Sequence, residues 1–114
     1  MSSLEHEVNQ LHSEICAGLA DPKRILILYA LAEGSKNVTE LAEFVGLPQP
    51  TASRHLKLLR ERGLVTSKRD GTSIYYSVTD ERIIQALDML RAVLADRLQN
   101  QAGLIESFTN DSRL

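Results

Sequence analysis

The chain has 114 residues, of which 43% are hydrophobic and 25% are charged, and its formal net charge is −2. This length predicts one domain with a single modest core, and small domains of this kind often gain further burial by dimerising. The single cysteine excludes an intrachain disulfide and a CxxC site, and the aromatic content of 4% argues against an aromatic stacking platform for single-stranded nucleic acid.

The N-terminal segment is too polar and acidic for a signal peptide, and its spacing predicts a helix instead. Four apolar residues recur at helical intervals between Leu4 and Ile15, so we expect a first helix over residues 4–18. The longest apolar run, residues 25–32, is too short to cross a bilayer. We therefore expect a cytoplasmic protein without a membrane partner.

A second helix is predicted over residues 22–33. Asp21 supplies its N-cap, and Pro22 occupies the first helical position, where a missing N–H costs nothing. The run ILILYALA is apolar nearly all round, and a helix of that kind is buried on every side. We expect this to be the central helix of the core.

Two further helices with a short connection follow. Asn37 and Glu40 form a capping box that opens a short helix over residues 38–44. A turn at residues 46–48 leads to a helix over residues 49–62, whose inward stripe is Ala52, Leu56 and Leu59. Two helices joined in this way predict a helix-turn-helix.

The runs LVTSK (64–68) and SIYYSV (73–78) predict a β-hairpin. Both are rich in β-branched or aromatic residues, and Asp70-Gly71 between them is a strong hairpin signal. A hairpin directly after a helix-turn-helix forms a wing. A long last helix begins after Thr79 or Asp80 and carries an apolar stripe.

These elements predict a mainly α fold with a small β-hairpin, a winged helix-turn-helix domain over residues 1–114. We expect residues 1–3 and about 109–114 to be disordered. A single small core cannot bury the apolar stripes of both the first and the last helix, so these stripes predict a homodimer. The expected interface residues are Leu4, Val8, Leu11, Ile15, Leu87, Leu90, Leu94 and Leu98.

The charge is unevenly distributed along the chain. Residues 54–69 hold six lysines and arginines against one glutamate, whereas the remainder holds seven cations and fourteen anions. A local basic block on an acidic body is typical of a phosphate-binding face. In this position it indicates double-stranded DNA as the partner.

The recognition helix of a helix-turn-helix presents its first turns to base edges in the major groove. A glutamine can bind adenine, an arginine guanine, and a threonine methyl can pack on thymine. Side chains further along the helix bind phosphates, and cations on a wing can lie along the minor groove. The residues expected to contact DNA are Gln49, Pro50, Thr51, Ser53, Arg54, His55, Lys57, Lys68, Arg69 and Thr72.

Three segments of the chain, LADPKRILILYAL (19–31), NVTELAEFVGLPQPTASRHLKLLRERGLV (37–65) and KRDGTSIYYSV (68–78), resemble the ArsR/SmtB family of bacterial winged-helix repressors. The pattern Ser53-x-His55-Leu56-x-x-Leu59-x-x-x-Gly63-Leu64-Val65 is quite specific to that family. The resemblance implies a homodimer built through the first and last helices. It further implies binding to an inverted repeat in a promoter, repression of transcription, and release by an inducer.

Metal-sensing members of that family carry Cys-x-Cys in the third helix, or Asp, His and Glu ligands along the last. Residues 40–46 contain no Cys or His, and the last helix has Asp88 and Asp96 but no His. We therefore expect neither usual metal site and no cofactor.

His12 and Cys16 remain as a possible effector site, because residues four apart share one helix face. Three readings of Cys16 stay open: packing as a small apolar residue, a thiol switch that includes an interchain bridge, and binding of a metal or metalloid ion. The sequence names no inducer.

The sequence argues against two other classes of function. A winged-helix module that binds only protein would need an apolar or acidic recognition face, and the basic block at residues 54–69 argues against it. An enzyme would need a recognisable site, and the chain has no Gly-rich phosphate loop, no Ser-x-x-Lys and no HExxH. We expect no catalytic activity.

Overall fold

A computed structural model describes the backbone of residues 2–112 and the side chains of residues 2–101. It contains two compact units, Met1–Glu81 and Arg82–Leu114. None of the helices in the described residues combines the length and the apolar character that a membrane crossing requires. That the whole chain forms a single domain stays a prediction.

The first helix changes its hydrogen-bonding pattern halfway along. The α-helix α1 spans Ser2–Leu11, and a π-helical turn, η1, spans His12–Cys16. The expectation of one uninterrupted α-helix was therefore wrong in its second half. Arg62 donates a hydrogen bond to the carbonyl oxygen of Ser13, which an α-helix would pair with the N–H of Ala17. That N–H bonds instead to the oxygen of His12, 2.9 Å away, as in a π-helix.

The next helix, α2, spans Pro22–Ala32 and forms the centre of the core. Asp21 is its N-cap and accepts a hydrogen bond from the N–H of Lys23 at 2.8 Å. Ile27 and Leu28 are fully buried. The expected start and the expected central burial of this helix are confirmed.

The helix-turn-helix consists of α3, Val38–Val45, and α4, Gln49–Glu61. Asn37 and Glu40 form the expected capping box, with hydrogen bonds of 2.8 and 3.1 Å. The α4 stripe is also as expected, because all three of its members are buried. They are Ala52, Leu56 and Leu59.

The hairpin pairs β1, Val65–Asp70, with β2, Ser73–Val78, in antiparallel register. The connection is shorter than expected, because Asp70 pairs with Ser73 and only two residues turn. Gly71 has a φ of 65° and no other residue of the turn has a positive φ, which matches a type II′ turn. Tyr76 also exchanges two backbone hydrogen bonds with Lys36, of 3.2 and 2.8 Å.

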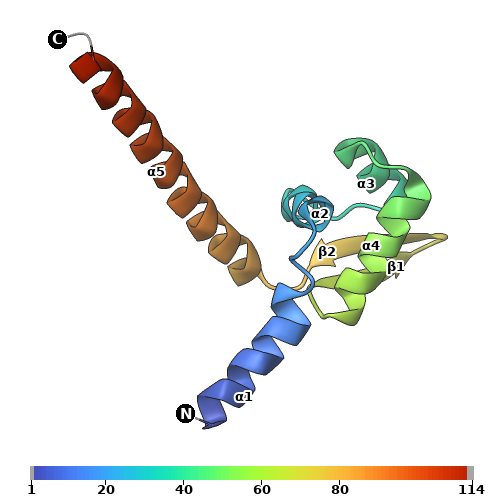
Figure 1. The fold of residues 1–114 in the computed structure, drawn as a ribbon. Coiled ribbons are helices and arrows are strands. Elements are labelled where there is room, and N and C mark those ends of the chain that lie inside the picture. Colours follow the sequence, from blue (N-terminus) through green and yellow to red (C-terminus); the bar gives the residue numbers. More distant parts are fainter. Residues whose placement is uncertain (1, 113–114) are drawn as a thin grey trace. The chain divides into compact units, whose positions relative to one another are not determined.

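In the first unit, α2 contacts α3, α4 and β2, and α4 contacts β1. The helix-turn-helix and the hairpin therefore surround α2 as one cluster, and α1 projects away from it (Figure 1). No α1 side chain is buried. Its apolar stripe is covered by nothing within its own unit.

The second unit is the long helix α5, which spans Glu81–Ser112. Leu87 is buried, whereas Leu90, Leu94 and Leu98 are more than half exposed. The backbone is helical at residues 2–3 and 109–112, and the expected disorder of the two ends stays a prediction. Met1 and residues 113–114 lie outside the described residues.

Candidate nucleic-acid interface

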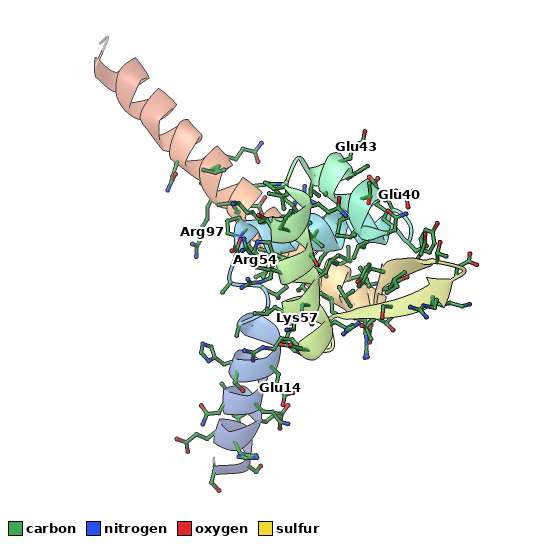
Figure 2. All side chains as sticks on the ribbon, turned by 90° about the vertical axis from the view of Figure 1, so that its right-hand side faces the viewer. Glu14, Glu40, Glu43, Arg54, Lys57 and Arg97 are labelled. Carbon is green, nitrogen blue, oxygen red and sulfur yellow. The ribbon has the colours of Figure 1, made fainter. Side chains whose placement is uncertain are left out.

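The buried residues on one face of α4 determine which side chains are exposed on the opposite face. Ala52 and Leu56 are buried, so their helical neighbours Ser53, Arg54 and Lys57 turn outward and are exposed. Figure 2 shows Arg54 and Lys57 along α4. This arrangement places cations on the surface of the recognition helix without any charge in the core.

The side chain of Arg54 is held loosely by the preceding turn. One of its terminal nitrogens, Nη2, donates to the hydroxyl of Thr51 at 3.4 Å. Thr51 is half-buried, so it supplies a fixed anchor on the helix surface. The contact directs the guanidinium toward the N-terminal end of α4, which is the end that approaches base edges in a helix-turn-helix.

The N-terminus of α4 has no side-chain cap. Pro48 occupies the N-cap position, Gln49 and Pro50 follow, and no acidic residue lies in the first turn. The first N–H groups of a helix lack intrahelical partners and carry partial positive charge. Gln49 and Pro50 are both exposed, so this positive helix end is accessible to a phosphate.

His55 differs from the neighbouring cations because it is half-buried. Its Nδ1 lies 3.4 Å from Nη1 of Arg24 in α2. Burial lowers the pKa of His55 below 6.5, Asp21 opposes that shift, and Arg24, Lys23 and Arg54 add to it. The shift favours the neutral form of His55, which offers hydrogen bonds, over the charged form.

The expected wing residues Lys68, Arg69 and Thr72 are all exposed. Successive residues of a strand face opposite sides, so Lys68 and Arg69 extend from different faces of the hairpin. Both nevertheless line one hollow of about 330 Å³, together with Ser35, Asp70 and Tyr75. The backbone pairing of Lys36 with Tyr76 joins this hairpin to the segment that precedes α3.

Arg24 is a part of this site that was not predicted from the sequence. Its guanidinium contacts His55 and the carbonyl oxygens of Ala17 and Gly18, just after η1, although Arg24 lies 31 residues before His55. One local feature of the sequence could have indicated its role. A cation in the first turn of a helix interacts unfavourably with the positive end of the helix dipole, so we expect another group to stabilise its charge.

The proposed effector residues and the first apolar stripe lie on one projecting segment. His12 and Cys16 are exposed in η1, and Leu4, Val8 and Leu11 are about half exposed in α1. Cys16 is therefore not buried within a single chain. In the described residues, no group of three or more His, Cys, Asp or Glu side chains is placed to hold a metal ion.

Comparisons with known proteins agree with this architecture. A family model described as a bacterial regulatory protein of the arsR family matches residues 21–67, from the N-cap of α2 into β1. KmtR, an HTH-type transcriptional regulator of Mycobacterium tuberculosis, is 44% identical over 72 residues, which are 63% of this chain and 55% of KmtR. The nodulation protein NolR of Rhizobium meliloti is 36% identical over 92 residues, 81% of this chain and 75% of NolR.

A solved structure extends the likeness to the fold. It is the solution structure of a homodimeric winged helix-turn-helix DNA-binding domain from Mycobacterium bovis, described as a possible ArsR-family transcriptional regulator. The TM-score is 0.75 at 28% identity, and the match covers 88% of this chain and 92% of that one. The expected fold class, a winged helix-turn-helix, is confirmed.

Proposed function

Because the chain belongs to the ArsR family of bacterial regulatory proteins, we propose that it is a sequence-specific regulator of transcription that binds double-stranded DNA. It acts as a homodimer on an inverted repeat in a promoter and represses transcription by occupying that site. Its place of action is the cytoplasm, where a prokaryotic chromosome lies.

One observation carries this proposal. The recognition helix α4 presents an exposed, cationic face from Ser53 to Lys57, over a packed stripe that fixes its orientation. A face that bound only protein would be apolar or acidic. In the proposed complex, Gln49, Thr51, Ser53 and Arg54 contact base edges, while His55 and Lys57 contact the phosphate backbone.

The proposed dimer is supported by the exposed stripes of α1 and α5. Leu90, Leu94 and Leu98 are each at least 56% exposed in the single chain. Rows of leucine at helical spacing are a large apolar area to leave in water, and a second copy would cover them. The M. bovis domain, which resembles this chain along most of its length, is homodimeric.

Selection from a random pool of DNA duplexes tests the proposal. The full chain is incubated with the pool, bound duplexes are recovered over several rounds, and the enriched sequences are tested by gel shift. We expect an inverted repeat whose half-sites are one helical turn apart between centres, and binding that weakens steeply with salt. Absence of enrichment, even at low salt, would refute the proposed function.

The exposure of Cys16 favours a second candidate, regulation of DNA binding through that thiol. An oxidant could join Cys16 to the partner's cysteine, or a thiophilic ion could bind Cys16 and His12. Native mass spectrometry with and without reductant and chelator separates these outcomes. A dimer that carries a free thiol and no metal under every condition would contradict both.

A further inference from the structure

Arg24 lies where the end of η1, the start of α2 and the recognition helix meet. Its side chain is only 15% exposed. Nε donates to the carbonyl oxygen of Gly18 at 2.8 Å, and Nη2 donates to that of Ala17 at 3.2 Å. The carboxylate of Asp21 lies 3.9 Å from Nη1. The guanidinium is thus held from two sides by groups that can only accept hydrogen bonds.

The remaining partner of Arg24 is His55, 3.4 Å from Nη1. A guanidinium has no lone pair to offer, so it can only donate in this contact. Nδ1 of His55 must then be the acceptor and carry no proton. In a neutral imidazole the proton consequently resides on Nε2, which is the ring nitrogen left for an outside partner.

We propose that Arg24 is a positioning residue for DNA binding, which holds His55 in the Nε2–H form so that Nε2 donates a hydrogen bond to a backbone phosphate. This inference rests on the proposed function, because it assigns a role to His55 within that interface. Arg24 itself contacts no DNA in this arrangement. It acts through the orientation and the tautomer of His55.

The packing around Arg24 explains how its position is fixed. A Cβ added at Gly18 would lie 2.6 Å from Cδ1 of Leu64, so the chain beyond η1 passes directly against the segment that joins α4 to β1. This close approach brings the carbonyl oxygens of Ala17 and Gly18 to the guanidinium. The recognition helix is thereby tied to the end of the first helix through one side chain.

The first experiment needs no DNA. Long-range ¹H–¹⁵N NMR of the full chain reports the protonation of both imidazole nitrogens. The native protein should show His55 as the Nε2–H tautomer at pH 7.5. In Arg24→Met, the two nitrogen shifts should move toward each other as the second tautomer becomes populated, and the pKa of His55 should rise because a cation has been removed.

Arg62→Met is the matched control. Arg62 also donates to a carbonyl oxygen of η1, that of Ser13, but among the described residues it makes no hydrogen bond to His55. Its replacement should leave the nitrogen shifts of His55 unchanged. An Nδ1–H tautomer in the native protein would overturn the proposal whether or not Arg24→Met folds. Unchanged shifts in a folded Arg24→Met would do the same.

The second experiment measures binding to the duplex selected from the random pool. Both variants lose this hydrogen bond at each of the two half-sites. At about three- to tenfold for each bond, binding should weaken about 10- to 100-fold in Arg24→Met and in His55→Ala. The double variant should bind no more weakly than the weaker single variant, because both changes remove the same contact. If the double variant instead lost affinity by the product of the two single losses, Arg24 would act independently of His55, and the proposal would be overturned.

These outcomes separate the two proposals. If no duplex is selected, the proposed function fails, while the NMR experiment still decides the state of His55. If a duplex is selected and the NMR shifts do not respond to Arg24→Met, the positioning role fails and the DNA-binding function stands.

Discussion

Arg54 illustrates how single side chains in α4 divide between reading bases and holding the backbone. It is exposed, it is directed toward the helix N-terminus by Thr51, and it lies five residues after Gln49. His55, the next residue, turns toward Arg24 in α2. Adjacent positions on one helix therefore have different proposed roles because only one of them faces the core.

Replacement of Arg54 by alanine should weaken binding to the selected duplex by about 1–3 kcal/mol and relax the preference at one base pair of each half-site. Competition gel shifts against single-base variants of the site measure both effects. Arg97→Ala, which removes one cation from α5, is the control and should preserve the preference. If Arg54→Ala retained full affinity and the same sequence preference, the assignment of Arg54 to a base would be wrong.

His55 should make the stability of the first unit depend on pH. Its pKa in the folded chain lies below 6.5, chiefly because of burial, so the unfolded chain binds the proton more tightly. The stabilisation is present above pH 6.5 and is lost as the pH falls through the folded pKa. Denaturant unfolding at pH 7.5 and at lower pH should show this loss in the native chain, and His55→Ala should lack that component. Identical pH profiles for the two proteins would contradict the expectation.

At the scale of elements, the wing is held by a contact that the hairpin itself does not supply. Lys36, which precedes α3, pairs with Tyr76 of β2 through two backbone hydrogen bonds. The base of the hairpin is therefore fixed beside the helix-turn-helix. The exposed Lys68 and Arg69 remain toward its tip, where they can neutralise phosphates.

A double change, Lys68→Ala with Arg69→Ala, should weaken DNA binding nearly equally for all sequences. A plot of log affinity against log salt has a negative slope, and each lost phosphate contact makes it less steep by about 0.9. A dimer that loses two contacts at each wing should therefore have a slope that is less steep by about 3.6. Binding titrations at several salt concentrations measure the slope. Arg91→Ala with Arg97→Ala removes the same charge from α5, and an equal loss of slope there would argue against wing contact.

The start of α3 depends on a second local device, the capping box between Asn37 and Glu40. Asn37→Ala should reduce the free energy of unfolding by about 0.5–2 kcal/mol, because the N–H of Glu40 loses its side-chain acceptor. Chemical denaturation measures the difference. Glu43→Ala, an exposed change on the same helix, should stay within about 0.5 kcal/mol of the native value. Equal stability of the two variants would show that the box contributes little.

For the whole molecule, the proposed dimer depends on leucines that neither unit covers by itself. Burying one leucine contributes about 1.5–3 kcal/mol. Leu90→Glu with Leu94→Glu removes four buried leucines from a dimer, a loss of about 6–12 kcal/mol, whereas a micromolar dimer is held by about 8 kcal/mol. Light scattering should therefore report a monomer, and binding to the full inverted repeat should fall to that of a half-site.

The matched control is Gln85→Glu with Gln99→Glu, which adds the same two charges to exposed positions of α5 away from the stripe. This variant should remain dimeric. A Leu90→Glu, Leu94→Glu protein that stayed dimeric would place the interface elsewhere.

Elements whose signals involve only neighbouring residues could be predicted from the sequence. Asp21 and Asn37 predicted two helix starts, the spacing of Ala52, Leu56 and Leu59 predicted the buried side of α4, and Asp70-Gly71 predicted the hairpin. These signals are local because caps, helical periods and tight turns involve residues within a few positions of one another. They also sufficed to place the candidate DNA contacts on an exposed helix face and a wing.

Contacts between residues far apart in the chain could be identified only in the folded protein. Arg24 reaches His55 across 31 positions, Arg62 donates to the Ser13 carbonyl within the π-helical turn, and Lys36 pairs with Tyr76. Such contacts produce no periodic pattern in the sequence, because each depends on how elements that are far apart in the chain pack against one another. The tautomer of His55 therefore could not be predicted from its position in α4, because Arg24, which contacts it, belongs to α2.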